Sequence, residues 1–156
     1  MSGGGAPLPG ACVVDASVAV KWLVAEADSA RAAPLLRDAR RLHAPALLRV
    51  ECANILRKKH RRGIATRDEA VGGLALPDRV GLAWVDDMPH VAGALRRALG
   101  LDHPACDCVY LEVAASLRLP LVTADRRLAA FSGRDGATVL HLDSFGAAAG
   151  PSLGAP

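Results

Sequence analysis

Two aspartates stand at the ends of short apolar runs, where a carboxylate is unexpected. Asp15 closes the run 12–14, and Asp125 closes the run 120–124. Such runs are typical of the buried strands of a parallel sheet, and burying a carboxylate costs free energy unless something compensates its charge. In open α/β sheets the ligand crevice lies outside the carboxyl ends of the strands. Both aspartates would therefore reach the same rim if the two strands are parallel neighbours.

Two further acids lie on expected helices. Glu51 falls on a largely apolar helical face, a poor place for a lone glutamate, and Asp107 falls in the first turn of another helix, where the positive helix end favours an acid. Each acid also has an ordinary explanation. Asp15 and Asp125 could cap the helices that follow their strands. Asp107 could be a simple helix-start acid, and Glu51 could pair with a nearby arginine.

Taken together, the four acids predict a metal site. Carboxylates that lie close together repel and raise one another's pKa values, and a divalent cation removes that repulsion. Mg²⁺ prefers oxygen ligands, keeps several waters and needs few direct carboxylates. One or two such ions would polarise a phosphodiester and generate a hydroxide nucleophile at neutral pH. We therefore expect Mg²⁺ at Asp15, Glu51, Asp107 and Asp125.

The elements that must position these acids alternate between strand and helix. Strands are expected at CVVDA, GLAWVDD, LPLVTAD and ATVLHLD, and RLHAP is expected to form a brief strand or a loop. The clearest helix is ALLRVECANILRKKHRRG, which Gly63 ends. Pro34 interrupts another helical stretch, and Thr66 and Glu69 have the spacing of a capping box. The alternation predicts an α/β fold, a single-domain α/β/α sandwich with a central, mainly parallel sheet.

Length and composition fit one globular domain. The chain has 156 residues, of which 51% are hydrophobic and 22% charged, a composition typical of globular rather than disordered proteins. We expect a flexible leader over 1–10, a folded domain over 11–145 and a flexible tail over 146–156. No apolar stretch reaches the roughly 18 residues needed to cross a bilayer, and the opening lacks the features of a signal peptide. We therefore expect a cytoplasmic protein without a membrane partner.

Positive charge is concentrated in one part of the chain. Residues 31–67 hold eleven of the nineteen lysines and arginines and only two acids. This concentration is typical either of a helix end that complements the helix dipole or of a phosphate-binding surface. The residues that could hold a nucleic-acid strand by its phosphates are Arg57, Lys58, Lys59, Arg61 and Arg62, together with Arg126 beside the last acid.

Other chemistries find less support in the motifs. Cys106 and Cys108 lie near His103, but the paired C-x2-C spacing of a zinc site is absent. A phosphatase with an aspartyl nucleophile would need a second aspartate two residues after Asp15, and Ser17 stands there. The absence of G-x-x-x-x-G-K-[ST] disfavours an enzyme acting on nucleoside triphosphates.

Three segments together resemble a known family. VVDASVAVKW, LLRVECANILRK and DCVYLEVAASLRLPLVTADRRLA resemble the PIN domain, and more narrowly the VapC-type toxins of bacterial toxin–antitoxin pairs. The resemblance runs from about Cys12 to about Asp143 and implies a Mg²⁺- or Mn²⁺-dependent endoribonuclease. It implies that Asp15, Glu51, Asp107 and Asp125 are the catalytic metal ligands, and that Ser17 and Thr123 are supporting hydroxyls. Asn54, one turn after Glu51, is a further candidate for a supporting hydrogen bond.

The resemblance also implies partners. It implies an RNA substrate, a cognate antitoxin whose segment lies in a groove near the active site, and a homodimer. The apolar side chains of 18–24 could line that groove as well as the core. Two alternatives remain open: a PIN-type nuclease of RNA processing that is not a toxin, and a catalytically silent module that binds RNA or an antitoxin.

Overall fold

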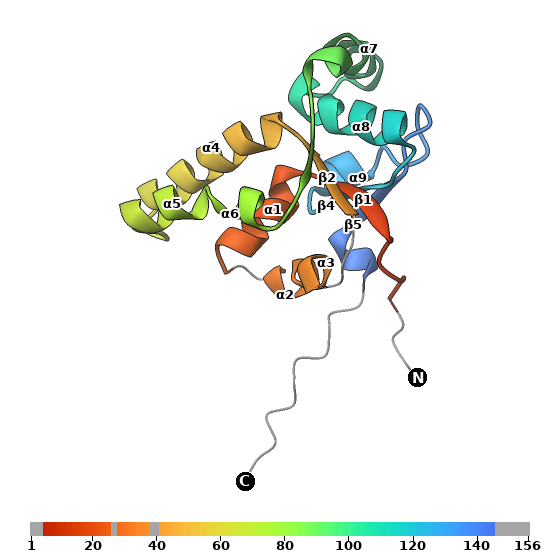
Figure 1. Cartoon of the computed structure of the whole chain (residues 1–156). Helices are drawn as coiled ribbons and strands as arrows, with labels where there is room; N and C mark the ends of the chain where they lie inside the picture. The colour runs from red at the N-terminus through yellow and green to blue at the C-terminus, as the bar shows by residue number, and fades with distance from the viewer. Residues whose placement is uncertain (1–4, 26–27, 38–40, 146–156) are drawn as a thin grey trace.

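The computed structural model describes residues 5–25, 28–37 and 41–145 (Figure 1). Part of the expected leader, 1–4, and the whole expected tail, 146–156, lie outside the described residues. Within the rest of the leader, the Ala6 N–H donates to the Ser144 carbonyl at 2.8 Å. No helix in the described ranges is both long enough and apolar enough to cross a membrane.

The described residues build one sheet from five strands, in the order β3-β2-β1-β4-β5. Every neighbouring pair is parallel; Cys12 lies opposite Leu42, for example, and Val14 opposite Val122. The predicted sandwich around a mainly parallel sheet is thus confirmed. The strands are β1 (Ala11–Val14), β2 (Arg41–Pro45), β3 (Ala83–Val85), β4 (Leu121–Thr123) and β5 (Val139–His141).

Helices cover the sheet on both faces (Figure 1). The connection between two parallel strands of one sheet is right-handed. The direction in which the chain moves along the sheet therefore decides on which face of the sheet the connecting helix lies. Between β1 and β3 the chain runs toward one edge and forms α1 (Ala16–Leu23), α2 (Ser29–Ala32), α3 (Pro34–Arg37), α4 (Leu47–Arg61), α5 (Arg67–Gly73) and α6 (Leu76–Arg79). From β3 to the end it runs toward the other edge and forms η1 (Met88–His90), α7 (Val91–Leu101), α8 (Ala105–Leu117), α9 (Arg126–Ala129) and η2 (Leu142–Ser144).

Local signals set several helix ends. Pro34 opens α3 and so divides the expected second helical stretch into two short helices, because proline lacks an N–H and fits the first turn of a helix. Gly63 follows α4 with φ of +70°, the left-handed conformation that glycine adopts without a steric penalty. The capping box is confirmed, since Thr66 and Glu69 exchange both of its hydrogen bonds at the start of α5.

The core lies against the central strands. Val13, Val14, Leu121 and Val122 are fully buried, because helices cover both faces of β1 and β4 and leave no solvent side. Polar groups that follow these strands therefore emerge directly from the core. That is the position of the two strand-end aspartates.

Candidate active site

A cavity opens at the carboxyl ends of β1 and β4. β2 and β4 flank β1 on opposite sides. After β1 the chain therefore continues toward one edge of the sheet, and the later strands β4 and β5 lie toward the other edge. Such a switch point is where open parallel sheets bind ligands. The cavity has a volume of about 470 Å³ and is lined by Asp15, Ala16, Ser17, Glu51, Asn54, Ile55, Lys58, Asp107, Tyr110 and Asp125. All four predicted acids therefore line one cavity, which we call the acidic cavity.

Asp15 is the most enclosed of these acids, at 6% exposure. Its Oδ1 accepts hydrogen bonds from the Ser17 hydroxyl at 2.6 Å and from the Val18 N–H at 3.2 Å, and its Oδ2 accepts from the Thr123 hydroxyl at 2.7 Å. Burial raises the pKa of Asp15 to about 6, against the lowering effect of these hydrogen bonds, and the charge of Asp107 adds to the rise. A buried carboxylate with a raised pKa gains from a nearby cation.

The two hydroxyls predicted as supporting groups join the ends of the strands. The Ser17 hydroxyl, besides donating to Asp15, accepts from the Ala124 N–H at 2.9 Å. The fully buried Thr123 hydroxyl accepts from the Asp125 N–H at 2.9 Å. These bonds hold Asp15 in one orientation and tie the loop after β4 to the start of α1. The other predicted supporting residue, Asn54, lines the same cavity and is exposed.

Glu51 reaches the cavity from α4 and is held by Tyr110. The Tyr110 hydroxyl donates to Glu51 Oε2 at 2.5 Å. Burial raises the pKa of Glu51, and the charges of Asp107, Asp15 and Asp87 raise it further. Tyr110 itself is 1% exposed, and the sequence analysis gave it no role. The available signal was its position three residues after Asp107, which places both side chains on the same face of α8.

Asp107 lies in the first turn of α8, as predicted, and is half-buried. His103 Nε2 lies 2.8 Å from Asp107 Oδ2, within ion-pair distance. The geometry of this contact is not that of a hydrogen bond, because the same Nε2 atom has no hydrogen-bond partner among the described residues. His103 is a second residue near the acids that the sequence analysis did not place in the site.

Asp125 completes the set from the end of β4. Its Oδ1 accepts from the Arg127 N–H at 2.7 Å and from the Leu128 N–H at 3.4 Å, which caps α9. Asp15 likewise caps α1. The ordinary explanation for both aspartates is therefore correct, and both residues also line the acidic cavity.

The donor set suits a hard divalent cation. Burial and the charges of neighbouring acids raise the pKa values of both Asp15 and Glu51, so these carboxylates carry unfavourable charge that a cation would relieve. Within the described ranges, no three His, Cys, Asp or Glu side chains are close enough to form a ready-made metal cluster. Mg²⁺ fits such an arrangement, because it keeps several waters and binds through one or two carboxylates.

The six basic residues predicted to bind RNA lie in different parts of the structure, and all six are among the described residues. Lys58 lines the acidic cavity, whereas Lys59 is only 8% exposed and is part of the interior. Arg126 directly follows Asp125 in the sequence, is exposed, and pairs with Asp143. The end of α4 carries the remaining exposed side chains, those of Arg57, Arg61 and Arg62.

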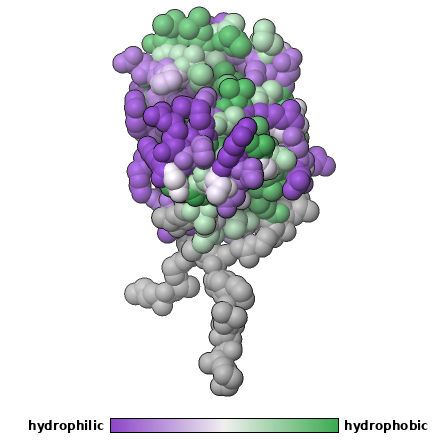
Figure 2. Space-filling model, turned by 90° about the vertical axis from the view of Figure 1, so that its left-hand side faces the viewer, coloured by the Kyte–Doolittle hydropathy of each residue, from purple (hydrophilic) through white to green (hydrophobic). Residues whose placement is uncertain are grey.

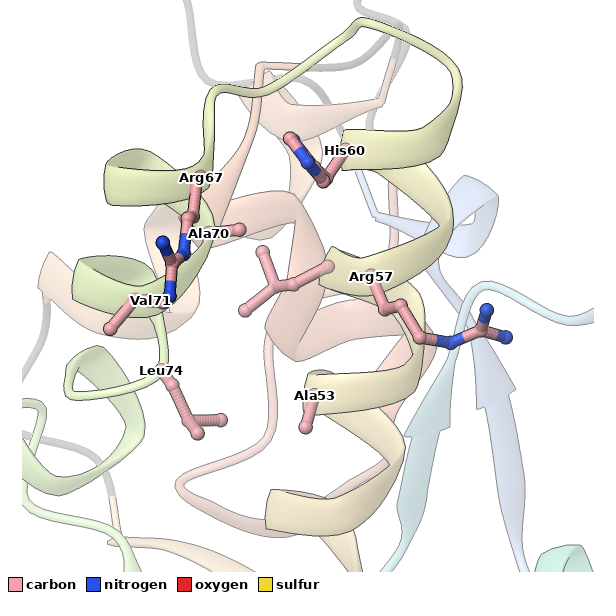
Figure 3. Close-up of a pocket in the computed structure, with 8 residues that line it drawn as sticks. Ala53, Arg57, His60, Arg67, Ala70, Val71 and Leu74 are labelled. Atoms are coloured by element: carbon pink, nitrogen blue, oxygen red, sulfur yellow. The ribbon is translucent and has the colours of Figure 1, made fainter.

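A second cavity, of about 280 Å³, lies between α4 and α5 (Figure 3). Val71 on α5 and Leu74 directly after it line the cavity, whereas Arg57 on α4 extends its guanidinium away from α5. We call this cavity the α4–α5 groove; its lining residues are Ala53, Leu56, Arg57, His60, Arg67, Ala70, Val71 and Leu74. The lining is thus apolar and basic, and it includes no acid.

The apolar side chains of 18–24 were expected in the core, in a partner groove, or in both, and Trp22, Leu23 and Val24 are half-buried. Val18, Ala19 and Val20 are buried in the core. The Trp22 indole N–H donates to the Ala32 carbonyl at 2.9 Å, which fixes this half-buried ring against α2. Figure 2 shows the largest apolar area of the side that it presents at the top of the molecule, at the height of α7 in Figure 1, and smaller apolar areas lower down.

Comparisons with known proteins agree with this architecture. A crystal structure of a Pyrobaculum aerophilum protein is 28% identical, covers 81% of each chain and superposes with a TM-score of 0.59. A toxin–antitoxin complex from Klebsiella pneumoniae is 15% identical, with coverage of 84% of this chain and 97% of that one and a TM-score of 0.60. VapBC-5 from Mycobacterium tuberculosis, a toxin–antitoxin system, is 21% identical, with coverage of 85% and 99% and a TM-score of 0.55.

A comparison with curated proteins returned no match. The sequence model of the PIN domain matches residues 12–133, a span that contains β1 except for Ala11, β2 to β4, α1 to α9 and all four acids of the cavity. This chain therefore belongs to the PIN-domain family.

Proposed function

We propose that this protein is a divalent-metal-dependent endoribonuclease that acts as the toxin of a toxin–antitoxin pair. Mg²⁺ would be its metal, with Mn²⁺ as a substitute. The observation that carries the proposal is the acidic cavity, where Asp15, Glu51, Asp107 and Asp125 from four separate segments meet in a PIN-domain chain. A purely structural set of acids would not need to converge at the ligand-binding edge of the sheet.

In this proposal the chain's own residues hold and orient the reacting groups. Ser17 and Thr123 each donate to one oxygen of Asp15, so its carboxylate keeps one orientation, and Tyr110 does the same for Glu51. A divalent cation held by the four acids would lower the pKa of a water molecule and would offset negative charge on the phosphate. A carboxylate of the cavity would accept the proton of the attacking water.

Basic residues would bind the RNA through its phosphates. Lys58 lines the acidic cavity, so its ammonium group can approach the phosphate that is cleaved. Arg57, Arg61, Arg62 and Arg126 are exposed and would contact neighbouring phosphates. We leave Lys59 out of this surface, because the residue is only 8% exposed and little of it is available to a phosphate. Phosphate contacts position a strand without reading its sequence.

The α4–α5 groove is the surface we propose for the antitoxin. Its apolar lining and two basic residues, His60 and Arg67, complement an amphipathic helix that carries acidic side chains beside its apolar face. The relatives described as toxin–antitoxin complexes make such a partner a reasonable choice. A homodimer remains a prediction, and light scattering of the purified protein would test it.

Cleavage of RNA tests the central claim. Total RNA incubated with the purified protein and Mg²⁺ should be cut at mapped internal sites, and a chelator should stop the cutting. Asp15→Asn and Asp125→Asn should each lower the cleavage rate by at least about 100-fold, because loss of a ligand should cost more than the 10- to 100-fold typical of groups that only support one. Asp135→Asn is the matched control, since Asp135 is exposed and the same change of charge occurs away from the cavity.

Two results would separate the alternatives. Full cleavage by Asp15→Asn would overturn the nuclease mechanism, and no cleavage by the folded wild type would favour a silent binding module. A nuclease that cuts RNA but neither arrests growth when expressed nor binds a small protein encoded beside its gene would be a processing enzyme rather than a toxin.

A further inference from the structure

A buried histidine beside the acidic cavity takes no part in the function as described so far. His103 lies in the short link between α7 and α8. Its side chain is 2% exposed, and its ring packs edge-on against Phe131, with centroids 4.9 Å apart and planes at 71°. The link is tightly constrained, because Asp102 has a left-handed φ of +50° and Pro104 restricts the backbone of the residue before it. The ring is therefore held in one place.

The Nε2 atom of His103 is the informative group. It lies 2.8 Å from Asp107 Oδ2, and this buried nitrogen has no hydrogen-bond partner of normal geometry in the described part of the chain. A buried polar atom without a partner is unfavourable and uncommon in native structures. Asp107 also lines the acidic cavity. The unpartnered atom thus faces a carboxylate that we propose as a metal ligand.

We propose that His103 is a positioning residue for Asp107. Its Nε2–H would hold Oδ2 and so turn Oδ1 of the same carboxylate toward the divalent cation. The inference rests on the proposed function, because it assigns a partner to one of the proposed metal ligands. Hydrogen bonds in active sites are often poorly aligned without ligands and tighten in the loaded site. Groups that hydrogen-bond a ligating carboxylate typically change metal affinity or activity by 10- to 100-fold.

A simpler role is packing against Phe131, and the variants must separate the two roles. His103→Phe keeps an aromatic ring and removes the donor. His103→Gln keeps an N–H donor at similar reach. Phe131→Leu leaves the donor in place and weakens the packing of the ring. If the phenylalanine variant does not fold, His103→Leu replaces it in the same comparison with His103→Gln.

The test measures Mn²⁺ binding to the full chain by electron paramagnetic resonance, with circular dichroism to establish that each variant is folded. We expect His103→Phe to raise the Mn²⁺ dissociation constant by about 10- to 100-fold. His103→Gln should recover most of the affinity, and Phe131→Leu should bind Mn²⁺ like the wild type. In cleavage assays His103→Phe should need more Mg²⁺ for half-maximal activity while keeping its KM for RNA.

The outcomes distinguish this inference from the proposed function. Wild-type affinity in folded His103→Phe, or an equal loss in Phe131→Leu, would overturn the positioning role alone, because the wild type would still bind Mn²⁺. If the wild type itself bound no Mn²⁺, or if Asp15→Asn bound it equally well, the metal site would fail and this inference with it.

Discussion

Asp15 performs two tasks that would normally be assigned to different residues. It caps α1 by accepting from the Val18 N–H, and it lines the acidic cavity. A cap alone would work at the surface, where its charge is solvated. The 6% exposure of Asp15 and its raised pKa show that this carboxylate is kept where its charge is unfavourable. That cost in stability is expected of a functional residue.

Asp15→Asn should therefore stabilise the metal-free protein at neutral pH. The pKa of Asp15 rises from 3.8 to about 6 on folding, so its stabilising contribution is complete below pH 3.8 and is lost as the pH rises through about 6. The loss corresponds to at most about 3 kcal/mol, and the gain in the variant is smaller because the amide nitrogen cannot accept from the Thr123 hydroxyl. Urea unfolding in chelator should show the variant more stable at pH 7.5 and the difference shrinking toward pH 4.

Asp135→Asn serves as the control for that experiment. It is an exposed aspartate, and a surface substitution of this kind usually changes stability by less than about 0.5 kcal/mol. If Asp15→Asn and the wild type were equally stable at pH 7.5, or if their difference grew in acid, the buried charge of Asp15 would not lower the free energy of unfolding as we expect.

At the scale of elements, the pair α7 and α8 sets the position of Asp107. Arg97 Nε on α7 donates to Glu112 Oε2 on α8 at 2.6 Å, and Gly93 leaves the space in which the Glu112 side chain lies. A Cβ at Gly93 would come within 2.3 Å of Glu112 Oε1 and 2.9 Å of its Cγ. The lack of a side chain at this position is thus what allows the two helices to pack with an ion pair between them.

Gly93→Ala should destabilise the fold, although alanine is the better helix former. Overpacking of this kind typically costs about 1–3 kcal/mol, because Glu112 must move and its ion pair with Arg97 is disturbed. Gly100→Ala is a matched control on the same helix, since a Cβ there meets nothing within 4 Å, and it should raise stability by up to about 1 kcal/mol. Guanidinium unfolding of both variants measures the contrast, and equal effects would exclude the steric explanation.

At the scale of the whole molecule, the acidic cavity and the α4–α5 groove share one helix. Glu51, Asn54 and Lys58 on α4 line the cavity, while Ala53, Arg57 and other residues of the same helix line the groove. α4 therefore presents different faces to the proposed catalytic site and to the proposed partner. A protein bound in the groove would lie next to the site that it controls.

Val71→Glu should weaken binding of the antitoxin without unfolding the protein. Val71 is 70% exposed, so the change removes little buried surface, and its negative charge opposes the acidic side chains that we propose for the partner. The affinity for the small protein encoded beside the gene, measured by calorimetry, should fall at least about tenfold, or 1.4 kcal/mol. Met88→Glu, at a residue 76% exposed on η1, should bind normally; equal losses in both variants would argue against the groove.

The sequence by itself determined the alternation of strands and helices and hence the α/β class, because hydrophobic periodicity is a local property of the chain. It also determined the capping box at Thr66 and the positions of the four acids at strand ends and on helices. These features depend on residues a few positions apart, and each is visible in the sequence.

Only the tertiary structure decided which side chains meet. The order of the strands brings Asp15 and Asp125 together, and helix packing brings Tyr110 to Glu51 across 59 residues of sequence. Helix packing also turned Lys58 toward the cavity and Lys59 into the interior, a choice that a run of basic residues does not encode. The physical reason is that contacts between distant segments depend on crossover direction and on the burial of whole faces, whereas a local pattern reports only its own element.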